Sequence, residues 1–272
     1  MITANILYKH LKKWVCQPKD HRTGWFNCLT FDGTQVVATN THKLIVVKDF
    51  PTSTPHFENS KGQLVGSDGV TLISSLDEVS NTLKQDIVTK TIPVAYKVIP
   101  KDEECQWSVE INSNWFVQMK NAFEYLHKMS KKDRFSKVCM LNFHDKQLFA
   151  LGANEYYGAK FLLSDDLPDT PKWYSYFNSL HLMECMELVI DTQAPTMKLS
   201  ISFKRDEPNI NSERPYREEE LWKSICKIET KELIMVSTSI KIFGIDDSDA
   251  IKLINFAKSE SVRPDNEAFI QQ

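Results

Sequence analysis

Residues 36–47, VVATNTHKLIVV, give the clearest indication of the fold. The two ends of this stretch are apolar and β-branched, as is typical of buried strands. The middle, residues 39–43, is polar and turn-prone, so the pattern predicts two strands joined by a tight connection. His42 and Lys43 lie at that connection. Two interpretations are open: an ordinary solvated hairpin tip, or a turn that presents a surface to a binding partner.

The chain is long enough for two domains, and its composition is that of a globular protein. It has 272 residues, of which 42% are hydrophobic and 25% are charged. The net charge of −3 and the pI of about 6.2 show no global basic excess of the kind that marks many nucleic-acid-binding proteins. A local basic face is compatible with these totals.

Several classes of protein are not expected. No apolar run approaches the roughly 18 residues of a membrane span, and the N-terminus, MITANILYKH, lacks the order of a signal peptide. The six cysteines have no CxxC spacing, which argues against a zinc site and against a disulfide framework. The sequence has no HExxH, GxGxxG or Walker pattern. We therefore expect a cytoplasmic, non-catalytic protein with no metal, no cofactor and no membrane partner.

The first half of the chain is expected to contain two helices with strands between them. Residues 5–14 have the apolar periodicity of a helix. The pattern of residues 24–51 predicts three strands, with a hairpin turn at Asp32 and Gly33. Residues 67–84 then predict a second helix, with Ser67 or Asp68 as its N-cap.

The second half repeats this order. Residues 108–129 predict a strand and then a helix capped by Asn112 or Ser113. Three strands (136–163), a helix (176–189) and a strand (196–205) are expected to follow. Placing Phe31 on Phe143 also places Val36 on Leu148, an offset of 112 residues. The shared order and offset indicate a duplicated module.

The predicted fold is therefore α+β, with two repeated modules. The expected modules are residues 1–104 and 105–243, followed by a C-terminal extension, 244–272. In each module, helices should lie on one side and antiparallel strands on the other.

The opening stretch resembles the ATDGHRLA segment of bacterial DNA sliding clamps, the beta subunit of the replicative polymerase. WFNCLTF resembles the strand before that segment, and TIPVAYKVIP resembles the family's FPDYxxVIP run. YFNSLHLMECMELV with TMKLSISF resembles a helix and strand of the last clamp domain, and ELIMVSTSIKI resembles the terminal strand. The resemblance covers most of residues 1–243 and is to the middle and last clamp domains only. It implies processivity-fold modules, the first of them abbreviated in its second half.

In the family, these segments line a hydrophobic cleft that accepts short peptides of polymerases and repair proteins. Carried over by resemblance, the peptide-binding cleft would comprise Phe26, Thr39, Thr41, His42, Lys43, Leu44, Pro93, Lys97, Val98, Val236, Thr238 and Ile240. Two of these positions depart from the family pattern. Thr41 replaces a glycine, and Lys43 replaces an arginine whose planar fork an ammonium does not reproduce. The alternative is that His42 and Lys43 form a solvated tip and that Leu44 is core.

The resemblance also implies a DNA-facing surface, because clamp helices line a ring and contact phosphates rather than bases. The candidate residues are Lys9, Lys12, Lys13, Lys120, Lys128, Lys131, Lys132 and Arg134. The alternative is a solvated charged face, since the helix at 176–189 carries Glu184 and Glu187 with no Lys or Arg.

We therefore predict a clamp-like DNA processivity factor and scaffold. Its expected partners are polymerase or repair proteins through short peptides, double-stranded DNA without sequence specificity, and further copies of itself, with a trimer favoured over a monomer. The alternative is a non-ring homologue that sequesters clamp-binding peptides or regulates replication. An enzyme of unrecognised type is the third possibility.

The C-terminal extension contains a short apolar stripe at helical spacing, formed by Ala250, Leu253, Ile254 and Ala257. Ser248 is a possible N-cap. Two interpretations are open: a helix that covers exposed core, or a segment that folds back and competes with peptides for the cleft.

Overall fold

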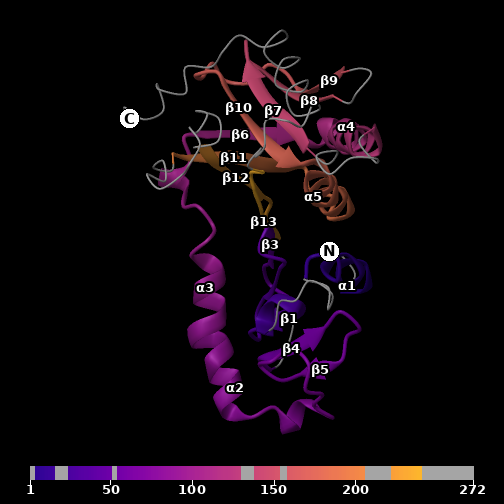
Figure 1. Cartoon of the computed structure of the whole chain (residues 1–272), viewed down its shortest axis with the longest axis vertical. Coiled ribbons are helices and arrows are strands. Elements are labelled where there is room, and N and C mark those ends of the chain that lie inside the picture. Colours follow the sequence, from indigo (N-terminus) through magenta and orange to yellow (C-terminus); the bar gives the residue numbers. More distant parts are fainter. Residues whose placement is uncertain are drawn as a thin grey trace, which may run out of the picture. The chain divides into compact units, whose positions relative to one another are not determined.

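The computed structural model describes residues 4–15, 24–50, 54–129, 138–153, 158–205 and 222–240. The chain forms two compact units (Figure 1). Unit 1 comprises Met1–Lys101, Asp191–Ala194 and Lys227–Val236, and unit 2 comprises Asp102–Ile190, Pro195–Cys226 and Ser237–Gln272. No described helix is long and apolar enough to cross a membrane.

Unit 1 is built on an antiparallel sheet in the order β5-β4-β1-β2-β3-β13. Its strands are β1 (Cys28–Phe31), β2 (Val36–Thr39), β3 (Lys43–Val47), β4 (His56–Asn59), β5 (Leu64–Val65) and the first part of β13 (Leu233–Thr238). Its helices are α1 (Ala4–Leu11), α2 (Asn81–Asp86) and α3 (Ile92–Tyr96), with 3-10 turns at Gly24–Asn27 and Leu76–Glu78. The predicted helix at the N-terminus and the three predicted strands are confirmed.

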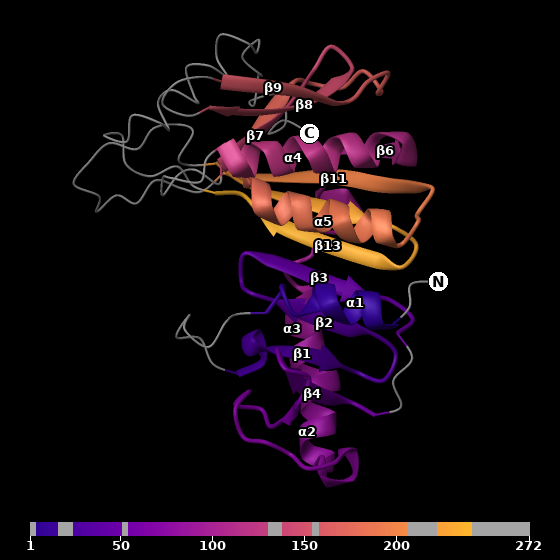
Figure 2. The same ribbon diagram turned by 90° about the vertical axis from the view of Figure 1, so that its right-hand side faces the viewer.

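Helices cover both faces of this sheet. Every residue of β1, β2 and β3 is buried, which requires cover on each side because side chains alternate between the faces. Figures 1 and 2 show α1 on one side of the strands and α2 with α3 on the other. Tyr8 on α1 donates a hydrogen bond to Glu58, whereas Tyr96 on α3 donates to Gln35 (2.6 Å). The one-sided arrangement expected from the sequence is therefore wrong for unit 1.

The second helix begins later than predicted. Ser67 and Asp68 lie in a turn, in which the Asp68 carboxylate accepts hydrogen bonds from the backbone N–H groups of Val70 and Thr71, both at 2.9 Å. These bonds and one from the Thr71 hydroxyl lower the pKa of Asp68 to about 2. Gly69 supplies the positive φ (73°) that an Asp-Gly turn requires. The helix starts at Asn81, where the hydroxyl of Ser80 caps it by accepting from the N–H of Leu83.

Helix then continues from residue 81 to residue 96, through a π turn at Ile87–Thr91. The π turn directly precedes Pro93, and the N–H of Ile92 donates to the carbonyl of Ile87. A proline inside a helix lacks an N–H and clashes with the carbonyl four residues earlier, so a wider turn relieves the clash. The segment TIPVAYKVIP is thus helical as far as Tyr96.

Unit 2 contains two sheets, one in the order β10-β7-β8-β9 and one that includes β12-β11-β6. Its strands are β6 (Trp107–Asn112), β7 (Val138–His144), β8 (Gln147–Ala153), β9 (Gly158–Ser164), β10 (Trp173–Asn178), β11 (Thr196–Arg205) and most of β12 (Trp222–Glu229). Its helices are α4 (Phe116–Met129) and α5 (Ser179–Asp191), with 3-10 turns at Asp102–Glu104 and Ser113–Trp115. Within unit 2, α4 and α5 lie on the same side (Figures 1 and 2).

The strands and helices predicted for unit 2 are confirmed, but the side chain of the predicted cap Asn112 makes no capping hydrogen bond, and β10 was not predicted as a strand. Residues 176–178 belong to β10 rather than to the following helix, whose start is marked by a hydrogen bond from the N–H of Leu180 to the side chain of Asn178 (3.0 Å). Strand β12 was not predicted.

The predicted duplication is confirmed by strand order and register. The neighbours β4-β1-β2-β3 in unit 1 correspond to β10-β7-β8-β9 in unit 2. Phe31 pairs with Val36 across β1 and β2, and Phe143 pairs with Leu148 across β7 and β8, so the offset of 112 residues holds in both strands. The domain limits at 104 and 243 stay predictions, and the extension 244–272 lies outside the described residues.

Candidate functional site

The turn between β2 and β3 is closed by two of its own side chains. The amide oxygen of Asn40 accepts hydrogen bonds from the N–H groups of His42 (3.1 Å) and Lys43 (3.0 Å). The hydroxyl of Thr39 accepts from the N–H of Thr41 (3.1 Å) and donates to the carbonyl of Lys43 (2.8 Å). Asn side chains favour such turns because they bond to the backbone two and three residues further on. The backbone of the predicted connection is therefore held in one conformation.

Thr41 has a φ of +75°, in the left-handed region. This conformation is unfavourable for a β-branched residue, and it costs on the order of 1–3 kcal/mol. The motif that this stretch resembles has glycine at this position, where the conformation carries no such penalty. The Thr41 hydroxyl is also buried, with no hydrogen-bond partner among the described residues. Thr41 is thus a strained residue at the tip of the candidate site.

Lys43 and Leu44 are directed into unit 1. Lys43 is only 4% exposed, and its Nζ lies 4.8 Å from the centre of the Trp14 ring, which is itself fully buried. A cation over an aromatic face is stabilised by the ring quadrupole. Leu44 is buried as well, whereas His42 is exposed. Within the turn, His42 is therefore the side chain most open to a partner.

The candidate residues on and after α3 form an exposed group. Pro93 and Lys97 are exposed, and Val98 is 51% exposed. Tyr96 attaches this segment to Gln35, at the start of β2 rather than at the Thr39 end. Burial and the negative charge of Asp32 raise the pKa of Tyr96, so its hydroxyl stays a hydrogen-bond donor.

The remaining cleft candidates lie in different places. Phe26 is half-buried and stacks on Trp25 with a distance of 4.6 Å between ring centres. Val236 is buried in the part of β13 that belongs to unit 1. Thr238 and Ile240 belong to unit 2, where the N–H of Ile240 donates to the carbonyl of Tyr176 (2.9 Å). A single cleft that joins all of these residues stays a prediction.

The candidate DNA-facing lysines differ in their surroundings. Lys9 and Lys13 are exposed, and Lys12 lies over the ring of Tyr8 at 4.7 Å. On α4, Lys120 and Lys128 both pair with Glu124, at 3.3 and 2.5 Å, and these pairs lower the pKa of Glu124. The α4 lysines are thus partly neutralised. Lys131, Lys132 and Arg134 lie outside the described residues.

Two features of the described residues concern metal ligands and cysteine chemistry. In the part of the chain that the structure describes, no three His, Cys, Asp or Glu side chains are placed to hold a metal ion. Burial raises the pKa of Cys139 and of Cys226, which disfavours the thiolate that a nucleophile needs.

Sequence reasoning missed two residues that shape the site. Asn40 was treated only as part of a polar turn, although an Asn followed by a tight connection is a known signal for side-chain-to-backbone bonding. Trp14 is the last residue of the stretch with helical periodicity, and no sequence signal linked it to Lys43.

The arrangement of the strands and helices is the fold of DNA sliding clamps, present here as two modules. The beta subunit of DNA polymerase III from Pseudomonas aeruginosa matches with a TM-score of 0.54 at 12% identity, covering 88% of this chain and 64% of that chain. The subunit from Borrelia burgdorferi matches with a TM-score of 0.54 at 11% identity, covering 87% and 60%. The beta chain from Streptococcus pneumoniae matches with a TM-score of 0.55 at 10% identity, covering 89% and 64%.

These similarities concern the fold alone, because the identities are so low. The chain spans less than two thirds of the length of these clamp chains. No protein-family model and no curated protein matches the sequence.

Replacing Thr41 by glycine should raise the free energy of unfolding by about 1 kcal/mol, because glycine adopts a positive φ without strain. Urea denaturation of the whole chain measures this change. His42→Gly is the matched control: His42 is in the same turn without a positive φ, so glycine there should lower stability by about 0.5–1 kcal/mol. Equal destabilisation by both substitutions would contradict the assignment of strain to Thr41.

Proposed function

We propose that this chain is a non-catalytic, sliding-clamp-like scaffold that acts in the cytoplasm and binds short peptides of polymerase or repair proteins. The observation that carries the proposal is the β2–β3 turn, which lies in a clamp fold and adopts a positive φ at the position of the motif's glycine. Its exposed His42 can donate and accept hydrogen bonds. Val94 and Val98, 47% and 51% exposed, offer apolar contacts on and after α3.

The burial of Lys43 bears on the peptide that would bind. An arginine at this position would reach a carboxylate with its fork, but the Lys43 ammonium lies over Trp14. The proposed peptide therefore depends on apolar anchors and on contacts with His42 more than on an ion pair with Lys43.

Peptide binding tests this proposal directly. A fluorescent peptide with the Leu and Phe anchors of clamp-binding motifs should bind the full chain, and His42→Glu should weaken binding about tenfold, which equals about 1.4 kcal/mol. Fluorescence anisotropy measures the Kd. Lys61→Glu, on an exposed turn of unit 1, is the control and should leave the Kd unchanged. Absence of binding by the folded wild-type chain would overturn the peptide-binding proposal.

We also propose that α1 and α4 face double-stranded DNA. The exposed Lys9 and Lys13 suit non-specific phosphate contacts, whereas Glu124 compensates the charges of Lys120 and Lys128. This compensation, together with an α5 that has no Lys or Arg, favours the second candidate function: a non-ring homologue that sequesters clamp-binding peptides.

Glu124→Gln should strengthen retention on DNA several-fold, because it releases two lysines from their ion pairs. Lys9→Glu combined with Lys13→Glu should weaken retention and reduce its dependence on salt. Retention on closed circular DNA at two salt concentrations measures both effects. Lys90→Glu combined with Lys101→Glu is the charge-matched control, since both lysines are exposed in unit 1 and lie on or after the helix of residues 81–96 rather than on α1. No effect of any of these changes would favour the sequestering function.

Ring formation requires copies to join head to tail through sheet edges. In unit 1, β5 is the last strand of the sheet, and its outer side is already paired with the following segment: Val65 bridges Leu72, and the N–H of Gly66 donates to the carbonyl of Thr71 (2.8 Å). In that segment Val70 and Leu72 are 69% and 62% exposed, so it offers apolar side chains rather than a free strand edge. In unit 2, β9 ends the other sheet. Exposed edges with apolar neighbours are ready to pair with another chain.

If the exposed apolar side chains of Val70 and Leu72 join copies into a ring, sedimentation at tens of micromolar should show a trimer, and Leu72→Asp should convert it to a monomer. Val88→Asp is the control, because Val88 is 48% exposed on the helix rather than beside the sheet edge. A wild-type monomer at this concentration would exclude the ring and leave the sequestering homologue.

A further inference from the structure

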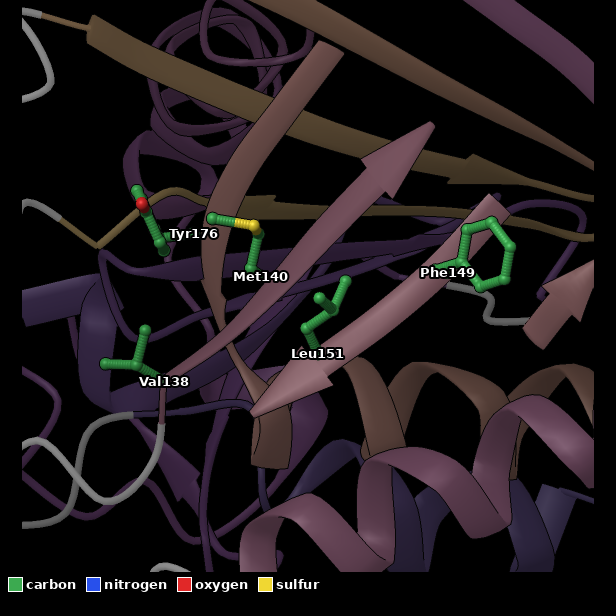
Figure 3. Close-up of a cluster of buried hydrophobic side chains, with 5 residues drawn as sticks. All are labelled: Val138, Met140, Phe149, Leu151 and Tyr176. Carbon is green, nitrogen blue, oxygen red and sulfur yellow. The ribbon is translucent and has the colours of Figure 1, made fainter. Parts of the chain in front are cut away.

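One face of the β10-β7-β8-β9 sheet carries an apolar cluster formed by Val138, Met140, Phe149, Leu151 and Tyr176 (Figure 3). Met140 lies directly opposite Leu151 on β8 and opposite Tyr176 on β10, so the three side chains form a row across the sheet. Met140 is 2% exposed and Leu151 is 1% exposed. Side chains in such a row are covered only by groups that lie above the sheet.

This face is the one that α4 does not cover. A Cβ at Gly152 would lie 2.6 Å from a methyl carbon of Leu126, so Gly152 faces α4. Leu151 is its neighbour on β8, and neighbouring residues on a strand face opposite sides. The cluster therefore lies on the outer face of the sheet, away from the helix.

The described chain ends on this outer face. Ile240 packs against the cluster together with Leu162 and Tyr174. Leu162 and Tyr174 belong to the sheet itself, whereas Ile240 arrives from the segment after β13. The N–H of Ile240 donates a hydrogen bond to the carbonyl of Tyr176, and this bond holds Ile240 beside β10, an edge strand of the sheet. The chain after Ile240 thus starts at the rim of an apolar surface.

We propose that the C-terminal segment docks on this outer face through the stripe of Ala250, Leu253, Ile254 and Ala257. Ten residues separate Ile240 from Ala250 and span up to about 33 Å when extended. The sheet of β10, β7, β8 and β9 is only about 15 Å wide, so the stripe can reach any part of the cluster. Attachment at Ile240 also gives the stripe a high effective concentration there.

A positive charge beside the cluster would favour docking of the C-terminal segment, which carries acidic residues. The Lys160 ammonium lies 4.2 Å from the centre of the Phe149 ring. Three acidic residues, Asp246, Asp247 and Asp249, come just before the stripe. A helix that begins there would place negative charge at its N-terminus, where it is stabilising, and near Lys160. The docked segment would be part of unit 2.

Photo-crosslinking in the full chain tests the location. The photoreactive amino acid p-benzoylphenylalanine replaces Leu253, and the crosslinked tryptic peptides are identified by mass spectrometry. We expect crosslinks within one chain to residues 138–146 and 147–160, which contain β7 and β8. The same replacement at Asn255, on the opposite side of the expected helix, should give at most a tenth of these products.

Crosslinks from position 253 to residues 23–43 would instead show a segment that folds back on the β2–β3 turn, and they would overturn the proposal. Crosslinks between chains would identify a second copy as the occupant and would also overturn it, as would the absence of crosslinks to β7 and β8.

Thermal unfolding of the full chain supplies an independent measurement. Leu253→Asp combined with Ile254→Asp should lower Tm by roughly 5 °C or more, because two apolar contacts with the sheet are lost. Ser248→Asp combined with Asn255→Asp adds the same charge to the polar side and should change Tm by about 1 °C at most. Equal Tm values for the two variants would contradict docking. Neither measurement depends on peptide or DNA binding, so the outcome is separate from that of the proposed function.

Discussion

Unit 1 depends on the burial of both faces of its central strands. β1, β2 and β3 contain no exposed position. The hydrophobic effect therefore stabilises this sheet only if other elements of the chain pack on each of its two faces. α1 supplies one layer and the long helix through Pro93 supplies the other. The same demand explains Lys43, whose aliphatic stem and ammonium take a core position that is satisfied by Trp14.

Much of this fold was predictable from the sequence because the strands of the opening stretch are apolar and β-branched and the turns use specific residues. The sequence predicted both the Asp32–Gly33 turn and the offset of 112 residues between Phe31 and Phe143. The pairing register of β1 with β2 and of β7 with β8 confirms both predictions. The second helix was placed too early because Asp68 was treated as a cap, although Asp68 and Gly69 are the same turn dipeptide as Asp32 and Gly33.

The candidate site was less predictable than the fold, because its geometry depends on contacts that are distant in sequence. That residues 39–43 form a turn follows from their composition, but the burial of Lys43 depends on Trp14, 29 positions earlier. The position of α3 depends on Tyr96 reaching Gln35, 61 positions earlier. Local patterns contain no information on such pairs, so the sequence did not indicate that Lys43 is buried whether the turn is a solvated tip or part of a cleft.

The hydrogen bonds within the β2–β3 turn limit the ways in which the turn can bind a peptide. The N–H groups of Thr41, His42 and Lys43 all donate within the turn, to Thr39 and Asn40. A peptide that adds a strand to this connection would find these donors already used, because each N–H has one hydrogen to give. Recognition at the turn is therefore left to side chains and carbonyl oxygens, with His42 at the centre. Thr41 keeps its unfavourable positive φ only because these hydrogen bonds fix the turn around it. The turn therefore offers one fixed surface rather than an adaptable one.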